Sequence, residues 1–169
     1  FRPGEEVRSR ARLWLRALRV HQWVKNVLMF VPLALAHQLF DVDKLETLAL
    51  GFIAFNLCAS SVYLLNDLLD LGADRNHPSK RLRPFAAATL ALEHGLVAIP
   101  LLLAAAFTIA VYASIPFAAV LALYYVLTLA YSFDLKRRAL VDVFTLASLY
   151  TLRIIAGAVA ASVVISPWL

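Results

Sequence analysis

Five long apolar segments run through the chain, each bounded by polar or charged residues. They lie at about 23–40, 47–65, 95–115, 117–133 and 143–165, and a very tight turn at 114–116 is expected between the third and the fourth. A hydrocarbon core about 30 Å thick requires roughly 17–25 apolar residues in an α-helix. The first segment reaches that length only if residues 23–26 form an interfacial turn, and the fifth contains one charge, Arg153. The pattern predicts an all-α, polytopic transmembrane bundle with five spans.

The composition supports a membrane protein and excludes several other classes. Of 169 residues, 62% are hydrophobic and 16% are charged, against about 45–50% and 25% in soluble domains. The mean hydropathy is +0.77. These values exclude a disordered chain, a disulfide-stapled secreted module and an ordinary cytosolic enzyme. The single cysteine, Cys58, has no partner for an internal disulfide.

The net charge of +5 comes from basic residues that cluster beside the apolar segments. Such clusters are typical of a membrane surface, so we expect no nucleic-acid partner. Lys and Arg gather in 1–26, 66–86 and 134–138, whereas the alternate connections are acidic or uncharged. The positive-inside rule then places the N-terminus and the basic loops in the cytoplasm. We expect an integral protein of the plasma membrane whose site faces the cytoplasm.

The N-terminal region, 1–19, is predicted to form a linker followed by an interfacial amphipathic helix. From residue 7 onward, apolar residues such as Trp14 and Leu18 share one face, and arginines share another. The chain starts at Phe1 and its only methionine is Met29. We therefore expect an N-terminal fragment of a longer protein, with a possible fused or associated soluble domain upstream.

Candidate chemistry is concentrated where the second apolar segment ends. Asn66, Asp70 and Asp74 recur at i, i+4 and i+8, so they share a helical face, and Asp67 lies beside Asp70. Carboxylates this close repel one another unless a cation lies between them. Mg²⁺ takes oxygen ligands from one or two carboxylates and from substrate phosphates. The cluster indicates a metal–pyrophosphate site, and the alternative is a solvated acidic helix end.

A basic run follows the acidic one. His77-Pro78 ends the helix, because the residue before proline is disfavoured in the α region. Lys80, Arg81 and Arg83 then come within four residues. Arginine offers a planar fork for phosphate oxygens and lysine a point charge. Acids that hold a metal, followed by bases that hold phosphates, are what a pyrophosphate ester requires. The alternative is a loop whose basic charge only sets the topology.

Two further cations precede and follow these runs. Lys25 opens the first apolar segment, either as a phosphate ligand or as a side chain that reaches the interface. Arg153 lies about 16 Å past Asp142 at 1.5 Å per residue. A charge at that depth is costly and should face a polar cavity or a partner, so we favour a substrate phosphate over a structural ion pair. The small residues of 156–161 indicate close helix packing.

Several motifs resemble the UbiA prenyltransferase superfamily, whose members are intramembrane, Mg²⁺-dependent, all-helical enzymes that use polyprenyl substrates. The run from Asn66 to Asp74 looks like the first aspartate-rich motif of that superfamily. The decaprenyl-phosphate phosphoribosyltransferase branch is the most similar, on the runs 22–26, 74–84, 131–136 and 152–157. The similarity covers nearly all of 17–169, and 20–169 is expected to be the N-terminal part of such a transferase domain.

The resemblance implies a reaction and a set of site residues. The reaction is transfer of 5-phosphoribosyl from phosphoribosyl pyrophosphate to a polyprenyl phosphate, with Mg²⁺ as cofactor. Metal ligands would be Asn66, Asp67, Asp70 and Asp74. Substrate-binding residues would be Lys25, Arg75, Lys80, Arg81, Arg83, Lys136 and Arg153. Among these, Asp67, Asp70, Lys25 and Arg153 would be catalytic.

The sequence departs from the superfamily in its extent. Members have about nine spans and a second acidic motif in the later half, which this chain does not reach. Two other functions stay open. One is prenyl transfer from a polyprenyl pyrophosphate to an aromatic or other acceptor, which also needs a metal-bound pyrophosphate. The other is a non-catalytic transporter or scaffold. The density of bases at 80–83 favours phosphoribosyl transfer, because both of its substrates carry an additional phosphate.

Overall fold

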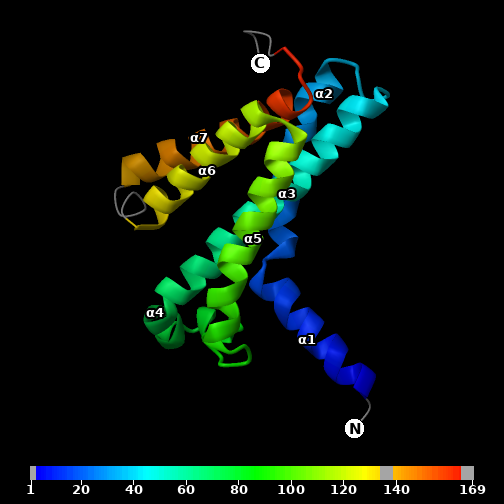
Figure 1. Ribbon diagram of the computed structural model, residues 1–169. Helices are drawn as coiled ribbons and strands as arrows, with labels where there is room; N and C mark the ends of the chain where they lie inside the picture. Colours follow the sequence, from blue (N-terminus) through cyan, green and yellow to red (C-terminus); the bar gives the residue numbers. More distant parts are fainter. Residues whose placement is uncertain (1–2, 134–138, 165–169) are drawn as a thin grey trace.

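A computed structural model describes residues 3–133 and 139–164, and within these ranges all the regular elements are helices (Figure 1). The α-helices are α1 (Pro3–Ala17), α2 (Val31–Leu35), α3 (Val42–Leu69), α4 (Leu71–Asn76), α5 (Leu92–Ala113), α6 (Ile115–Phe133) and α7 (Ala139–Ala160). Two 3₁₀-helices, η1 (Val20–Phe30) and η2 (Lys80–Leu82), complete the described elements.

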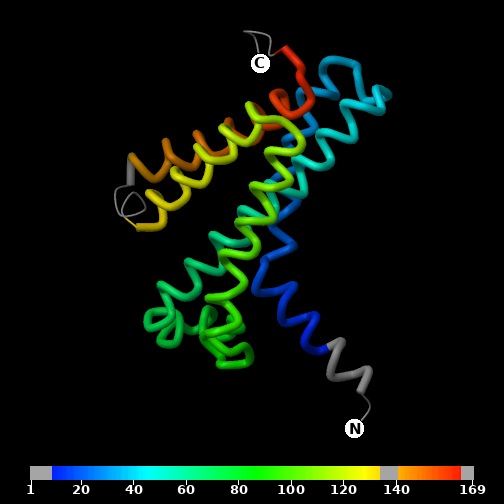
Figure 2. The backbone as a smooth tube through the Cα atoms, in the orientation of Figure 1, coloured from blue at the N-terminus to red at the C-terminus, as the bar shows by residue number. Residues whose placement is uncertain are grey.

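Four helices within the described ranges are long and apolar enough to cross a membrane, namely α3, α5, α6 and α7. They correspond to the second to fifth predicted spans, so the helical bundle is confirmed. Pro100 lies inside α5 without ending it. The predicted tight turn after α5 is also present, because only the extended Ser114 separates α5 from α6 and the chain reverses there (Figure 2).

The first predicted span differs from the expectation of one helix over 23–40. The segment instead forms η1 and then the short α2, which begins beside Pro32. A 3₁₀-helix rises about 2.0 Å per residue against 1.5 Å in an α-helix, so η1 and α2 together extend roughly 30 Å. That length equals the hydrocarbon thickness. The extended winding lets 16 residues, 11 in η1 and five in α2, cover a distance that would need about 20 in an α-helix.

The close packing predicted from the small residues of α7 explains where η1 lies. A Cβ atom at Gly157 would collide with the backbone of Met29. The missing side chain therefore lets η1 lie directly against α7. The Trp23 indole donates to Ser60 Oγ of α3 at 3.1 Å. Segment η1 is thus fixed between α3 and α7.

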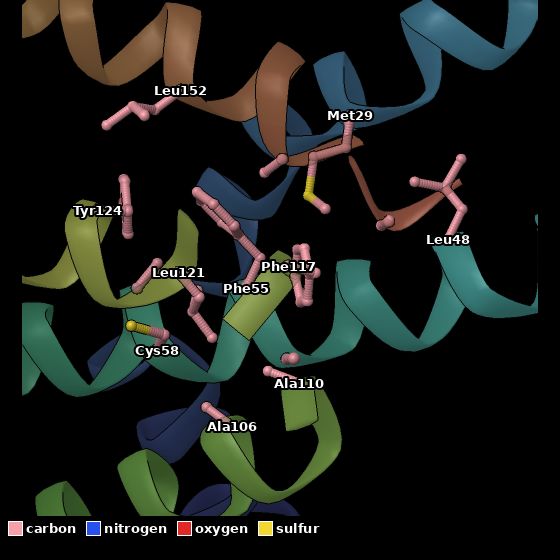
Figure 3. Close-up of a cluster of buried hydrophobic side chains, with 14 of the residues drawn as sticks. Met29, Leu48, Phe55, Cys58, Ala106, Ala110, Phe117, Leu121, Tyr124 and Leu152 are labelled. Carbon is pink, nitrogen blue, oxygen red and sulfur yellow. The ribbon is translucent and has the colours of Figure 1, made fainter. Parts of the chain in front are cut away.

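The bundle is organised around α3, which runs the length of the molecule with α5 packed along it (Figure 1). Helices α6 and α7 lie side by side and cross this pair at an angle. Where the elements meet, Met29, Phe55, Phe117, Leu121 and Leu152 form a buried hydrophobic cluster (Figure 3). This core holds η1, α3, α6 and α7 in fixed relative positions.

The two ends of the bundle differ in charge. At one end, a surface hollow lined by Asp43, Ser114 and Ser162 brings together the start of α3, the α5–α6 turn and the end of α7. This end carries the connections predicted to be outside. At the other end, where α4 lies, α1 extends away from the bundle on the far side of α5 from α4 (Figure 1). The apolar face of its last turn, with Ala17, packs against Leu64 and Phe85, so the predicted interfacial helix is tied to the protein at its C-terminal end.

Candidate functional site

A cavity of about 220 Å³ lies in the angle between α3, α6 and α7, with η1 contributing one residue. Its polar lining includes Lys25, Tyr63, Asn66, Tyr131, Tyr150 and Arg153. The cavity thus brings together three residues that the sequence singled out from distant segments, Lys25, Asn66 and Arg153. The remaining lining combines aliphatic side chains with Tyr124, Thr128 and Ser132, so the space offers both polar and apolar groups to a ligand.

Arg153 is held in place by a buried polar network. Its Nε donates to Asn26 Oδ1 at 2.7 Å and its Nη1 to the Leu149 carbonyl at 2.7 Å. Asn26 Nδ2 in turn donates to Asn56 Oδ1 at 2.7 Å. The network joins η1, α3 and α7, and fixes the guanidinium in one orientation. A longer contact of 3.5 Å runs from Nη2 to the Tyr124 hydroxyl.

The positive charge of Arg153 is not balanced by a carboxylate in the part of the chain that the structure describes. Its neighbours are aromatic rings, with the Tyr150, Tyr124 and Phe55 centroids 5.0, 5.5 and 6.0 Å from the guanidinium carbon. Ring faces and amide oxygens reduce the cost of burying the cation but leave its charge. A 6% exposed arginine at the wall of a cavity is therefore suited to binding an anion.

The aspartate-rich segment keeps its predicted helical spacing across the α3–α4 junction. Asp70 ends α3 and precedes α4, and its N–H bonds to the Asn66 carbonyl at 2.9 Å. The Asp74 N–H bonds to the Asp70 carbonyl at 2.8 Å. The predicted i, i+4, i+8 register is thus present in the backbone, although the side chains take different partners.

Asp67 and Asp74 are engaged by arginines. The side chains of both are 2% exposed. Asp67 Oδ1 accepts from Arg19 Nη2 at 2.5 Å and from Arg83 Nη1 at 3.2 Å, and Asp74 Oδ2 accepts from the same Nη1 at 2.6 Å. Within residues 3–133 and 139–164, no group of three or more acidic, histidine or cysteine side chains is arranged to hold a metal. The role of the four motif residues as metal ligands stays a prediction.

Two residues of the motif suit a metal with substrate phosphates. Asn66 lines the cavity, and Asp70, four residues later, shares its helical face. Mg²⁺ is commonly held by one or two carboxylates while phosphates and waters fill its remaining positions. An amide oxygen at the wall of a cationic cavity, with a carboxylate on the same helical face, fits that pattern, so Asn66 and Asp70 stay predicted ligands.

The remaining predicted bases lie in different places. Arg75, Lys80 and Arg81 are exposed at the α4–η2 end of the bundle. Arg83 is half-buried in the ion pairs described above. Lys136 lies outside the described residues.

Sequence reasoning did not single out the residues that hold the site in place. Arg19 was one of several arginines in a basic segment, and Asn26 was only the last residue of the motif at 22–26. Asn56 carried a signal that was not used, because an amide inside an uncharged apolar span requires a hydrogen-bond partner. Its partners are Asn26 and the Phe52 carbonyl, which Nδ2 reaches at 2.8 Å.

Comparison with known proteins gives consistent matches. The model of the UbiA prenyltransferase family matches residues 27–169. An uncharacterised protein of Sinorhizobium fredii, y4nM, is 46% identical over 156 residues, which are 92% of this chain and 30% of that protein. The decaprenyl-phosphate phosphoribosyltransferase of Mycolicibacterium smegmatis is 38% identical over 158 residues, which are 91% of this chain and 50% of that enzyme.

A solved structure has a similar fold. It is that of a UbiA homolog from Archaeoglobus fulgidus bound to DMAPP and Mg²⁺, with a TM-score of 0.73 and 18% identity. The match covers 91% of this chain and 56% of that one. At this identity the similarity concerns the fold, and it agrees with the all-helical membrane bundle. The chain spans about half the length of the phosphoribosyltransferase relative it matches.

Proposed function

The chain belongs to the UbiA prenyltransferase family, and we propose that it contributes to a membrane transferase that moves 5-phosphoribosyl from phosphoribosyl pyrophosphate to a polyprenyl phosphate. The observation that carries the proposal is the buried Arg153 charge, which faces a hydroxyl-lined cavity together with Lys25 and Asn66. The 38% sequence identity between this chain and the phosphoribosyltransferase of M. smegmatis supports the choice of reaction.

The residues of the cavity have distinct roles in this reaction. An oxygen of the lipid phosphate attacks the ribose C1 atom, the bond between C1 and the pyrophosphate oxygen breaks, and pyrophosphate leaves with the electron pair. Arg153 and Lys25 bind phosphate oxygens and stabilise the negative charge that accumulates on the leaving group. Asn66 and Asp70 would hold Mg²⁺, which when bound neutralises further charge on the pyrophosphate.

The cavity offers groups that can bond to a sugar phosphate. Tyr63 and Tyr150 each contribute a phenol group to the wall, beside the cationic Lys25 and Arg153. Ribose hydroxyls and phosphate oxygens can bond to these groups, whereas the Tyr131, Thr128 and Ser132 hydroxyls already donate to Asp142 and to backbone carbonyls. The lipid chain of the acceptor would then extend along the apolar outer surfaces of the helices.

Prenyl transfer is the second candidate, since the structural neighbour from A. fulgidus is bound to DMAPP. The two reactions share a pyrophosphate leaving group and differ in the group that is transferred. They are separated by supplying the full-length protein in nanodiscs with labelled phosphoribosyl pyrophosphate and a polyprenyl phosphate, and in parallel with a labelled prenyl pyrophosphate and an aromatic acceptor, and by separating product from donor in each case. We expect a labelled transfer product only in the first reaction. Labelled product only in the second would replace the proposal with prenyl transfer, and Mg²⁺- or phosphate-dependent flux without product would indicate a transporter.

The orientation of the site is part of the proposal. The basic end of the bundle carries α4 and η2 and is proposed to face the cytoplasm, where a soluble phosphorylated sugar would reach the site. The membrane is proposed to be the plasma membrane.

A further inference from the structure

A network of four charged side chains lies at the cytoplasmic end of α3, outside the main cavity. Arg19, Asp67, Arg83 and Asp74 form it, in an order that alternates positive and negative charges. The network joins three separate segments: the corner between α1 and η1, the α3–α4 region, and the loop after η2. With two cations and two anions it is neutral.

Helix geometry explains why Asp67 and Asp74 share Arg83. They are seven residues apart, and positions seven apart on an α-helix differ by only about 20° in direction. Asp70 and Asn66 lie on an adjacent face, where Asn66 lines the main cavity. The aspartate-rich segment therefore has two faces: one directed to the cavity and one covered by arginines.

Arg19 holds an unfavourable backbone conformation in order to reach this network. Its φ and ψ are 51° and 45°, in the left-handed region that costs a residue with a Cβ atom roughly 1–2 kcal/mol. This corner bends the chain between α1 and η1 (Figure 2) and directs the guanidinium onto α3. There it contacts Asp67 and also stacks 4.9 Å from the centroid of Tyr63, a residue of the main cavity wall.

A second cavity of about 370 Å³ opens at the same place. Arg19, Asp67, Ser79 and Arg83 are among its lining residues. The ion pairs therefore cross the space between the α1–η1 corner and the basic loop, and they determine where Arg83 lies relative to α3. Because Asp67 and Asp74 are both buried, removing one cation would leave a net negative charge beside the phosphate site.

We propose that Arg19 is a positioning residue which acts through Asp67: it neutralises the Asp67 carboxylate, so that Arg83 stays paired with Asp74 and this end of the site stays neutral toward a pyrophosphate group. Asp67 and Asp74 hold arginines, and the metal ligands are Asn66 and Asp70. The proposal rests on one part of the proposed function, namely that a pyrophosphate-bearing substrate binds in the main cavity. Both candidate reactions satisfy that condition.

The test is a double-mutant cycle in the full-length protein, with Arg19→Gln, Asp67→Asn and the double variant. Arg12→Gln is the matched control, because it removes the same charge from an exposed position on α1. Each protein is measured for the Kd of inorganic pyrophosphate with Mn²⁺ present, for Mn²⁺ binding alone by electron paramagnetic resonance, and for KM and kcat with the active donor. Thermal unfolding of each variant reports whether it folds.

Arg19→Gln should weaken pyrophosphate binding and raise KM about tenfold, equivalent to about 1.4 kcal/mol, with kcat changed less than about threefold and Mn²⁺ binding unchanged. Adding Asp67→Asn should restore the Kd and KM to within about threefold of wild type, because the remaining pair of Arg83 and Asp74 is neutral again. Arg12→Gln should behave as wild type. If Asp67 were a metal ligand, the second substitution would not restore binding. The double variant would then bind pyrophosphate more weakly than either single variant.

Two results would overturn the proposal. One is loss of Mn²⁺ binding in a folded Asp67→Asn protein, which would make Asp67 a metal ligand. The other is failure of Asp67→Asn to restore pyrophosphate affinity to folded Arg19→Gln protein, which would make the network only structural. If Arg19→Gln fails to fold, Arg19→Lys, which keeps the charge, replaces it as the single variant and should retain a Kd within about threefold of wild type. A larger loss in that protein contradicts the charge argument. Pyrophosphate binding does not depend on which donor is used, so absence of phosphoribosyl transfer would leave this test intact.

Discussion

Replacing Arg153 with methionine tests whether its charge serves substrate binding or the fold. The substitution preserves much of the side-chain volume while it removes the cation. It eliminates charged hydrogen bonds to Asn26 and Leu149, both of 2.7 Å, each contributing about 1.5–3 kcal/mol. It also removes the cost of burying a cation, which is several kcal/mol. Since these changes oppose each other, we expect the free energy of unfolding to change by no more than about 2 kcal/mol.

The effect on substrate binding has no such compensation. A phosphate charge about 4 Å from the guanidinium gains roughly 4 kcal/mol at an effective dielectric constant of about 20. Loss of that interaction corresponds to a decrease in kcat/KM of about 10²–10³-fold. Arg153→Lys keeps the charge but loses the planar fork that bonds Asn26 and Leu149 at once, so we expect an intermediate decrease of about tenfold.

The assay compares kcat/KM and unfolding temperature for wild type, the two Arg153 variants and Thr151→Val. Thr151 is an exposed position on the same helix whose hydroxyl bonds only to the Ala147 carbonyl, at 3.1 Å, so its variant should match wild type in both measurements. Addition of the pyrophosphate donor should raise the unfolding temperature of wild type but not of Arg153→Met. A folded Arg153→Met protein with kcat/KM within about threefold of wild type would refute the reasoning and make Arg153 a structural residue.

Three further predictions concern packing, metal binding and topology. Gly157→Ala should lower stability by about 3 kcal/mol or more because its methyl group would meet the backbone of η1, whereas Gly72→Ala, with open space around it, should raise stability by about 0.5–1 kcal/mol in chemical denaturation. Asp70→Asn should abolish Mn²⁺ binding and Mg²⁺-dependent transfer while the unfolding temperature stays close to that of wild type, and retained turnover would contradict the metal role. In intact cells, a membrane-impermeant thiol reagent should label Asp43→Cys, on the proposed outer side, and not Ser79→Cys. Cys58 of this chain is buried and should add no background labelling. The reverse pattern would invert the proposed orientation.

The sequence predicted the spans well because apolar length and flanking charge have direct physical meanings in a bilayer. It also predicted the α5–α6 turn and the close helix packing around Gly157. A very short connection and a missing side chain each allow few geometries. The first span was predicted as a regular helix because hydropathy does not report helical winding. Its 3₁₀ geometry depends on tertiary packing against α3 and α7, which local sequence does not encode.

The sequence predicted which residues would form the candidate site better than it predicted which side chains would contact one another. Lys25, Asn66 and Arg153 do line one cavity. The i, i+4, i+8 pattern drew attention to Asn66, Asp70 and Asp74 as one face, but the i, i+7 relation between Asp67 and Asp74 was equally present in the sequence. Which relation governs the side chains depends on Arg19 and Arg83, which approach from other segments, and a single sequence does not show which arginines will do so.

Whether an arginine is paired with a carboxylate separates the two roles that arginines have in this chain. Arg19 and Arg83 are each paired with carboxylates, so their charges are already neutralised and they have little left to attract a phosphate. Arg153 is surrounded by rings and amide oxygens, which tolerate its charge without neutralising it. An anionic ligand therefore gains most at Arg153 and least at the paired network. In the proposed transferase, the same residue type would therefore serve two purposes: arginine paired with aspartate holds the loops, and arginine without aspartate binds the pyrophosphate.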